Sequence, residues 1–194
     1  MDFALESLLS IALGLGLAAA AGFRVFVPLL FAGLAARVGW LELHETFAWL
    51  ETTPALIMLG TAAIFETLAY YVPGVDHLLD MISGPVAVIA GAVASASVMT
   101  DIQPILLWPL AIIAGGGAAA LTKGGSALIR AKTSFATAGL GNPVVSTAET
   151  ASAAGLSMLA ILVPILGLAV VIVLVVWGVR RTLRTRSARP KAED

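Results

Sequence analysis

The chain has 194 residues, of which 59% are hydrophobic and 12% are charged, and its formal net charge is -1. Soluble domains contain about 45 to 50% apolar residues, so this composition excludes an ordinary soluble domain and indicates a multi-pass membrane protein. There is no cysteine, which excludes disulfides, thiolate metal sites and cysteine nucleophiles. Because no Lys or Arg precedes Arg24, the N-terminus lacks the basic region of a cleaved signal peptide, and we expect it to be retained.

The first apolar run covers residues 5–36 and is longer than one membrane crossing requires. Gly22 and Pro28 lie on either side of Arg24, so we expect a kink or a broken helix there. A break would place the guanidinium group inside a helix bundle as a functional cation site. The alternative is one tilted helix in which Arg24 extends to the interface or forms a structural ion pair.

Residues 37–53 carry glutamates between apolar residues at helical spacing, which predicts a helix lying at the membrane interface. Trp40 and Trp49 would then lie at the level of the lipid headgroups. His44 is expected to be a solvated surface residue, because no second histidine stands at metal-site spacing.

The next span begins at Pro54 and carries Glu66 one turn before Tyr70 and Tyr71, which we expect at an interface. Asp76 and Asp80 follow, four residues apart, and would share one face of a helix. Because like charges at this spacing repel each other, a cation should lie between them. Pairing with a basic side chain, or simple solvation, is favoured over a metal ion. The basic candidates are Arg24, Lys123, Arg130 and Lys132.

Small residues dominate residues 85–99, which predicts an interior helix closely packed on its neighbours. A further span covers residues 102–122. Residues 134–150 include Asn142 and Glu149, so this segment can lie at membrane depth only where protein or a water-filled cavity shields it.

The last apolar segment covers residues 151–179, has Pro164 in its middle and precedes a basic tail at residues 180–194. The positive-inside rule places this tail in the cytoplasm, together with Lys123, Arg130 and Lys132. Residues 134–179 must then cross twice, which gives six spans with both termini cytoplasmic. Five spans, with residues 134–150 re-entrant, is the alternative.

Residues 54–100 and 104–160 share an order of features: a span, a charged linker and a helix started by proline. This similarity indicates an internal repeat of the kind found in many transporters.

Five segments resemble, in this order, a family of bacterial integral membrane proteins catalogued as a domain of unknown function. They are GFRVFVPLL, AYYVPGVDHLLD, ISGPVAVIAG, AIIAGGGAAAL and AGLGNPVVSTAE. The resemblance covers residues 5 to about 165 and leaves the tail outside. It implies a protein of the cell inner membrane and brings no catalytic residue, cofactor or substrate with it.

The sequence therefore predicts an all-α, multi-pass transmembrane helix bundle with small-residue interior helices. Residues 1–179 form one transmembrane domain, and residues 180–194 form a basic cytoplasmic tail. The expected partners are membrane lipids and a second copy of the chain. Nucleic acid is not expected, because no folded binding module accompanies the tail.

The leading functional hypothesis is a small transporter or channel-like protein for an ion or small solute. The alternative is a non-transporting structural, assembly or lipid-organising membrane protein. An enzyme is not expected, because no HExxH, GxSxG or P-loop pattern occurs, and neither is a cofactor or a metal site. Charges that converge on a shared cavity would favour transport, whereas isolated neutral pairs would favour a structural role. The polar path or ion-pair cluster would comprise Arg24, Glu66, Asp76, Asp80, Lys123, Arg130, Asn142 and Glu149.

Overall fold

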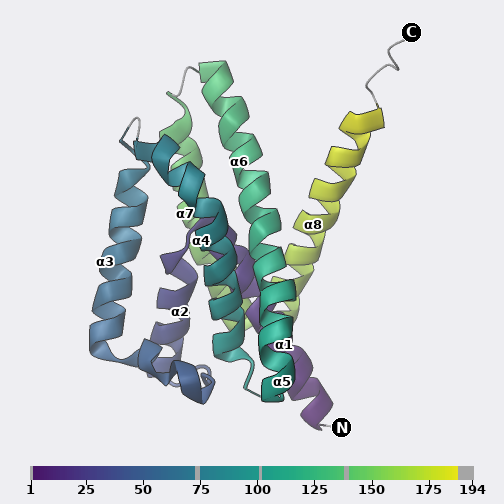
Figure 1. Cartoon of the computed structure of the whole chain (residues 1–194). Helices are drawn as coiled ribbons and strands as arrows, with labels where there is room; N and C mark the ends of the chain where they lie inside the picture. The colour runs from purple at the N-terminus through teal and green to yellow at the C-terminus, as the bar shows by residue number, and fades with distance from the viewer. Residues whose placement is uncertain (1, 73–74, 101, 138–139, 188–194) are drawn as a thin grey trace.

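The computed structural model describes residues 2–72, 75–100, 102–137 and 140–187, and these are helical almost throughout (Figure 1). No strand occurs in these ranges, so the predicted all-α class is confirmed. The elements are α1 (Asp2–Phe23), α2 (Phe26–Arg37), the 3₁₀ helix η1 (Glu45–Glu51), α3 (Thr53–Ala69), α4 (Val75–Val98), α5 (Pro104–Leu110), the π-helical turn η2 (Ala111–Gly116), α6 (Gly117–Thr137), α7 (Asn142–Leu162) and α8 (Pro164–Ser187).

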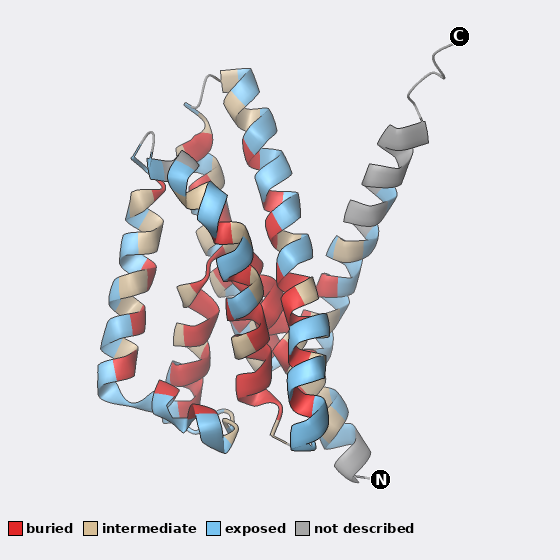
Figure 2. Cartoon of the chain, in the orientation of Figure 1, coloured by how far each residue is buried: buried red, intermediate tan, exposed pale blue. Residues whose placement is uncertain are grey.

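Helix α1 is the centre of the bundle and packs against α4, α6, α7 and α8. Its inner surface is built from small residues, and buried positions gather around it in the middle of the molecule (Figure 2). A Cβ atom at Gly16 would lie 2.5 Å from the Cβ of Ala160, and one at Gly22 would lie 2.5 Å from the carbonyl oxygen of Ala119. The small residues therefore allow helix backbones to approach closely.

Helix α4 has the interior position that its composition predicts. Ala87, Ala94 and Ser95 on this helix are fully buried, and α4 packs along α1 and η2. Pro85 lies inside α4, which begins ten residues earlier at Val75, so the prediction that a helix starts at this proline is wrong. Residues 54–100 and 104–160 both contain helices that run in opposite directions, but an internal repeat is not confirmed.

The chain breaks at Arg24, as the sequence predicts. Helix α1 ends at Phe23 and α2 begins at Phe26, and between them the chain turns back toward the end from which α1 came (Figure 1). Pro28 lies in the first turn of α2, where its missing N–H has no helical partner to lose. The first apolar run is therefore a helical hairpin with Arg24 at its tip, not one tilted helix.

Four helices in the described residues are long and apolar enough to cross a membrane, and a bent pair makes a fifth candidate. Six spans are therefore not confirmed. The four are Leu5–Phe23, Leu78–Val98, Pro104–Thr137 and Asn142–Leu162, and the pair is Glu45–Glu51 with Thr53–Ala69, bent by 70°.

The predicted boundaries in the C-terminal third are wrong. Instead of a span at residues 134–150 followed by one at 151–179, α7 covers Asn142–Leu162 and α8 starts at Pro164. Val163 separates them with φ -142° and ψ 80°, outside the helical region. A proline at the start of a helix costs no hydrogen bond, whereas in the middle of a span it would remove one.

The first residues of α1 and the last residues of α8 lie at opposite ends of the bundle (Figure 1). Helices α6 and α8 end at one end, and residues 38–52 and the C-terminal end of α4 lie with the start of α1 at the other. This arrangement does not agree with two termini on the same side. It does agree with the expectation that Lys132 and the basic end of the chain lie on one side, because α6 and α8 end together.

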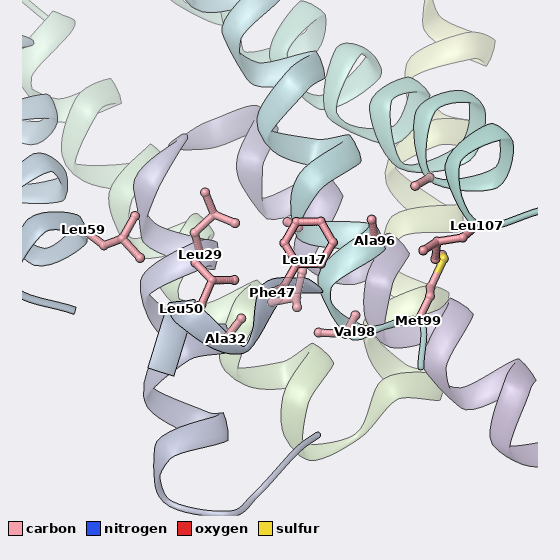
Figure 3. Packing of buried hydrophobic residues seen from close by; sticks show 12 residues of the cluster. Leu17, Leu29, Ala32, Phe47, Leu50, Leu59, Ala96, Val98, Met99 and Leu107 are labelled. Carbon is pink, nitrogen blue, oxygen red and sulfur yellow. The ribbon is translucent and has the colours of Figure 1, made fainter. Parts of the chain in front are cut away.

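Residues 37–53 close one end of the bundle through η1, which is shorter than the predicted interfacial helix. Phe47 and Leu50 are buried in an apolar cluster with Leu17 and Met99 (Figure 3). The exposed fractions of Trp40 and Trp49 are 62% and 47%, so both indoles remain available to an interface. His44 is half-buried, and its Nδ1 atom accepts a hydrogen bond from the N–H of Thr46 at 3.3 Å.

A candidate site: the buried charge cluster

Arg24 lies at the tip of the α1–α2 hairpin and is 1% exposed. Its Nε atom donates to the hydroxyl of Thr150 at 3.0 Å, and its Nη2 atom donates to the carbonyl and hydroxyl oxygens of Ser146 at 3.0 and 2.5 Å. The same Nη2 atom lies 3.5 Å from Oε2 of Glu149. All these partners belong to α7, so α7 fixes the guanidinium group in place.

Glu149 links α7 to α6. Its Oε1 atom accepts a hydrogen bond from the Ser126 hydroxyl, and its Oε2 atom accepts one from Nη2 of Arg130. Because Oε2 also faces Arg24, a single carboxylate lies against two guanidinium groups. Glu149 and Arg130 are 5% and 3% exposed, so this contact is shielded from solvent.

Asp80 on α4 extends the cluster to a second carboxylate. Its Oδ2 atom lies 3.5 Å from Nε of Arg130, and its Oδ1 atom lies 3.5 Å from Nζ of Lys123. The side chain of Asp80 is 30% exposed, whereas those of both bases are below 10%. We use "charge cluster" below for these five side chains: Arg24, Asp80, Lys123, Arg130 and Glu149.

Tyr70 is the aromatic centre of the charge cluster. The guanidinium carbons of Arg24 and Arg130 lie 4.3 and 4.4 Å from its ring centroid, within the range of cation–π attraction. Nζ of Lys123 donates to the Tyr70 hydroxyl at 3.4 Å. Tyr70 is 3% exposed, so the sequence-based placement of this residue at an interface is wrong.

Glu66 lies beside the charge cluster and caps a helix. Its two carboxylate oxygens accept hydrogen bonds from the N–H groups of Val25 and Phe26 at 2.9 and 3.2 Å. These N–H groups are at the start of α2, where the helix leaves backbone donors unsatisfied and its dipole favours a negative charge. Glu66 on α3 therefore stabilises the break that Arg24 occupies.

The remaining predicted residues occupy other places. Asn142 is buried at the start of α7, and its Oδ1 atom accepts a hydrogen bond from the Ser134 hydroxyl at 2.9 Å. The backbone of Asp76 lies on α4, but its side chain is outside the described residues. Lys132 is exposed on α6 and is not part of the charge cluster.

The charge cluster lies closer to one end of the bundle than to the other. Glu149 is seven residues after the first residue of α7, and Arg130 is seven residues before the last residue of α6. At about 1.5 Å per residue, both lie roughly 10 Å from the end at which α6 and α8 terminate.

A small cavity of about 230 Å³ reaches the charge cluster between α6 and α7. Glu149 and Ser126 supply polar groups to its wall, and most of the other residues that line it are apolar. The full lining is Phe23, Ser126, Ile129, Val144, Val145, Ala148, Glu149 and Ser152.

Three guanidinium nitrogens in the charge cluster are buried without a hydrogen-bond acceptor among the described residues, and two of them are terminal Nη1 groups. These two are Nη1 of Arg24 and Nη1 of Arg130. The third, Nε of Arg130, has Asp80 as an ionic neighbour at 3.5 Å. Because buried donors are nearly always satisfied in folded proteins, the two Nη1 groups are positions at which an acceptor could be held.

Groups of three or more His, Cys, Asp or Glu side chains that could hold a metal ion do not occur in the part of the chain that the structure describes. The donors in the charge cluster are mainly N–H groups, which suit an anion better than a cation.

Sequence reasoning did not single out Tyr70 as a site residue, nor the hydroxyl partners Ser126, Ser146 and Thr150. Ser146 and Thr150 are four residues apart in a segment already identified as too polar for lipid. That spacing puts both hydroxyls on one face of a helix, and this was the available signal.

A family model described as a domain of unknown function (DUF4126) matches residues 11–184. The chain belongs to the DUF4126 family. The match starts within α1 and ends in the last turns of α8, so it extends further toward the C-terminus than the resemblance noted from the sequence. The searches of curated proteins and of solved structures returned no match. Membership of the DUF4126 family names no activity, so the functional argument rests on the charge cluster.

Proposed function

We propose that this protein is a small membrane transporter that holds a small anion at the charge cluster and moves it together with a proton. The observation that carries the proposal is the break between α1 and α2, which brings Arg24 and the N-terminus of α2 among buried charges. Transporters commonly build their sites at such discontinuous helices, where helix N-termini face anionic groups.

The two unpartnered Nη1 groups support an anion as the solute. An unsatisfied buried donor costs about 1 to 3 kcal/mol, and more when it is charged. An anion held between Arg24 and Arg130 would accept hydrogen bonds from both groups and would lie near the Tyr70 ring. Arginine suits this role because its planar fork matches the oxygens of carboxylate and phosphate groups.

Charge balance supports the proton. The charge cluster and Glu66 together contain three bases and three carboxylates, so an added anion would bring an uncompensated charge to membrane depth. A proton taken up together with the anion would restore the balance of charge. The proton would thus compensate the anion, and neither would bind well without the other.

The positions of the exposed bases support an orientation for the transporter. The C-terminal ends of α6, which carries Lys132, and of α8 lie at one end of the bundle, and η1, which carries Glu45 and Glu51, lies at the other. By the positive-inside rule, we place the end of α8 in the cytoplasm of a cell with this protein in its inner membrane. The charge cluster then lies nearer the cytoplasmic side.

Flux measurements on purified protein in vesicles test the proposal. A pH dye inside the vesicles should report acidification when chloride or inorganic phosphate is added outside. Arg24→Lys keeps the charge but removes the Nη1 donor, so it should lower the flux about tenfold or more. Arg37→Lys is the matched control, because Arg37 is exposed and donates to Thr53 at the far end of the bundle.

The alternative is a non-transporting structural protein whose charge cluster only joins helices. It predicts no flux of any of these anions in wild-type vesicles, while Arg24→Lys would lower the melting temperature. Anion flux that Arg24→Lys leaves unchanged in folded protein would contradict the assignment of the charge cluster as the site. Neither proposal includes a catalytic step.

A further inference from the structure

An apolar groove of about 510 Å³ lies between α1, α6 and α8. Its longest wall is α6, from Ala120 to Ile129, and α8 contributes Val171, Leu174 and Val175. Of the residues that line it, Thr122 and Ser126 alone have polar side-chain atoms. The groove therefore suits an extended apolar group.

Two adjacent glycines create part of this space. A Cβ atom at Gly124 or at Gly125 would meet nothing within 4 Å. Helix α8 also diverges from α6 toward their C-terminal ends (Figure 1). Glycines such as Gly16, Gly22 and Gly91 bring helices into contact, whereas these two leave a surface uncovered.

The groove leads toward basic residues. Leu121, Gly125, Leu128 and Lys132 follow one another at helical spacing, so Lys132 continues the groove-lining stripe of α6 by one turn. Lys132 is exposed. No Asp or Glu occurs in residues 124–132 or 164–187, and the last turns of α8 contain Arg180, Arg181, Arg184 and Arg186.

We propose that this groove is a binding site for an anionic phospholipid, with an acyl chain between α6 and α8 and the phosphate group at Lys132. An apolar wall that ends in cations at the membrane surface matches a lipid whose acyl chain points toward the midplane and whose headgroup is negative. A dry apolar cavity of about 150 Å³ holds a benzene molecule, so about 510 Å³ leaves room for a much longer hydrocarbon.

A second copy of the chain is a poorer occupant of the groove. Two copies in the same membrane orientation that paired symmetrically through this face would bring their basic ends together. The resulting repulsion between like charges would oppose such a dimer, whereas it favours an anionic lipid.

Native mass spectrometry on the full chain in neutral detergent tests the site, with phosphatidylglycerol and phosphatidylcholine of identical acyl chains as the probes. The wild type should bind one phosphatidylglycerol about tenfold more tightly than phosphatidylcholine. Gly125→Leu fills the groove at a position with open space, so it should fold and lose phosphatidylglycerol binding about tenfold. Lys132→Gln should abolish the preference between the two lipids.

Gly155→Leu on α7 is the matched control, because Gly155 is also a helical glycine with nothing within 4 Å and lies outside the groove. It should bind phosphatidylglycerol as the wild type does. Unchanged lipid binding in Gly125→Leu, or equal affinity of the wild type for both lipids, would overturn the proposal. So would a wild-type dimer that Gly125→Leu converts to a monomer, since a second copy would then occupy the groove.

Discussion

Arg24 and Glu66 stabilise the same helix break by different means. Arg24 donates hydrogen bonds to side-chain and backbone oxygens of α7. Glu66 uses its two carboxylate oxygens to accept hydrogen bonds from backbone N–H groups at the start of α2. A carboxylate offers a separate acceptor oxygen to each N–H group, whereas an amide side chain has only one acceptor oxygen. The identity of residue 66 therefore matters for the hairpin even if nothing is transported.

Glu66→Gln should destabilise the protein by about 1 to 2 kcal/mol. Glutamine can accept one of the two N–H groups with its carbonyl oxygen, but its amide nitrogen cannot accept the other. The substitution also removes the negative charge that the dipole of α2 favours. Thermal unfolding in detergent, with Glu6→Gln on the exposed surface of α1 as the control, measures the difference.

Equal melting temperatures for Glu66→Gln and Glu6→Gln would contradict the capping role. The sequence alone suggested a different role for Glu66, as a member of a polar path or ion-pair cluster. Backbone donors at a helix start cannot be anticipated from charge spacing, because they depend on where the helix begins.

At the scale of single residues, the sequence identified the charges and the two basic partners of Asp80, but not Tyr70 or the hydroxyl partners. Because a charged side chain is costly at membrane depth, the sequence alone singles out Arg24 and Glu149. Tyr70 was missed because tyrosine is common at membrane interfaces, and only the fold shows that the ring lies between elements carrying Arg24 and Arg130.

Among the helices, the close contact of α4 with η2 and α6 depends on Gly91. A Cβ atom at Gly91 would lie 2.5 Å from the Cβ of Ala119 and 3.0 Å from the carbonyl oxygen of Gly115. The first atom is the methyl carbon of an alanine and the second belongs to the backbone, so neither can rotate away. The two helices would have to separate to admit a larger residue.

Gly91→Leu should therefore destabilise the protein by about 1 to 3 kcal/mol or prevent its folding. Gly60→Leu on α3 is the control, because a Cβ atom at Gly60 would meet nothing within 4 Å and no proline follows this residue. It should be neutral or slightly stabilising, since leucine has a higher helix propensity than glycine. Size-exclusion profiles and melting temperatures in detergent compare the two, and equal loss in both would contradict the interior position of Gly91.

The sequence predicted which segments are helical and buried better than it predicted where the helices end. The small residues correctly predicted that residues 85–99 lie in the interior. The same composition occurs in LGLGLAAAAG of α1 and indicates an equally close packing, but the sequence prediction did not include this central position of α1. The boundary at Val163 was missed because Pro164 stands in a continuous apolar run, where a kinked span and a reversal of the chain have the same composition. Only the structure distinguishes the kinked span from the reversal, because it shows α7 and α8 as two helices that each pack against α1.

For the whole molecule, the number of crossings and the sides of the termini are linked. A hairpin formed by α1 and α2 starts and ends at the same end of the bundle, and α3, α4, α6, α7 and α8 then alternate in direction (Figure 1). After the hairpin these five helices each run along the bundle in alternating directions, so the chain finishes at the opposite end. This is why the start of α1 lies away from the end of α8, although the sequence alone favoured an even number of crossings.

Cysteine labelling can test this topology directly, because the natural chain contains no cysteine. Glu6→Cys, Glu42→Cys and Lys132→Cys each place one thiol at an exposed position. In intact cells, a membrane-impermeant maleimide should label positions 6 and 42 but should label position 132 only after permeabilisation. This outcome follows from the acidic residues around position 42 and the basic end of α8, which the positive-inside rule assigns to opposite sides. Labelling of position 6 on the same side as position 132 would mean that the chain crosses the membrane between residues 6 and 42, and it would rule out the α1–α2 hairpin.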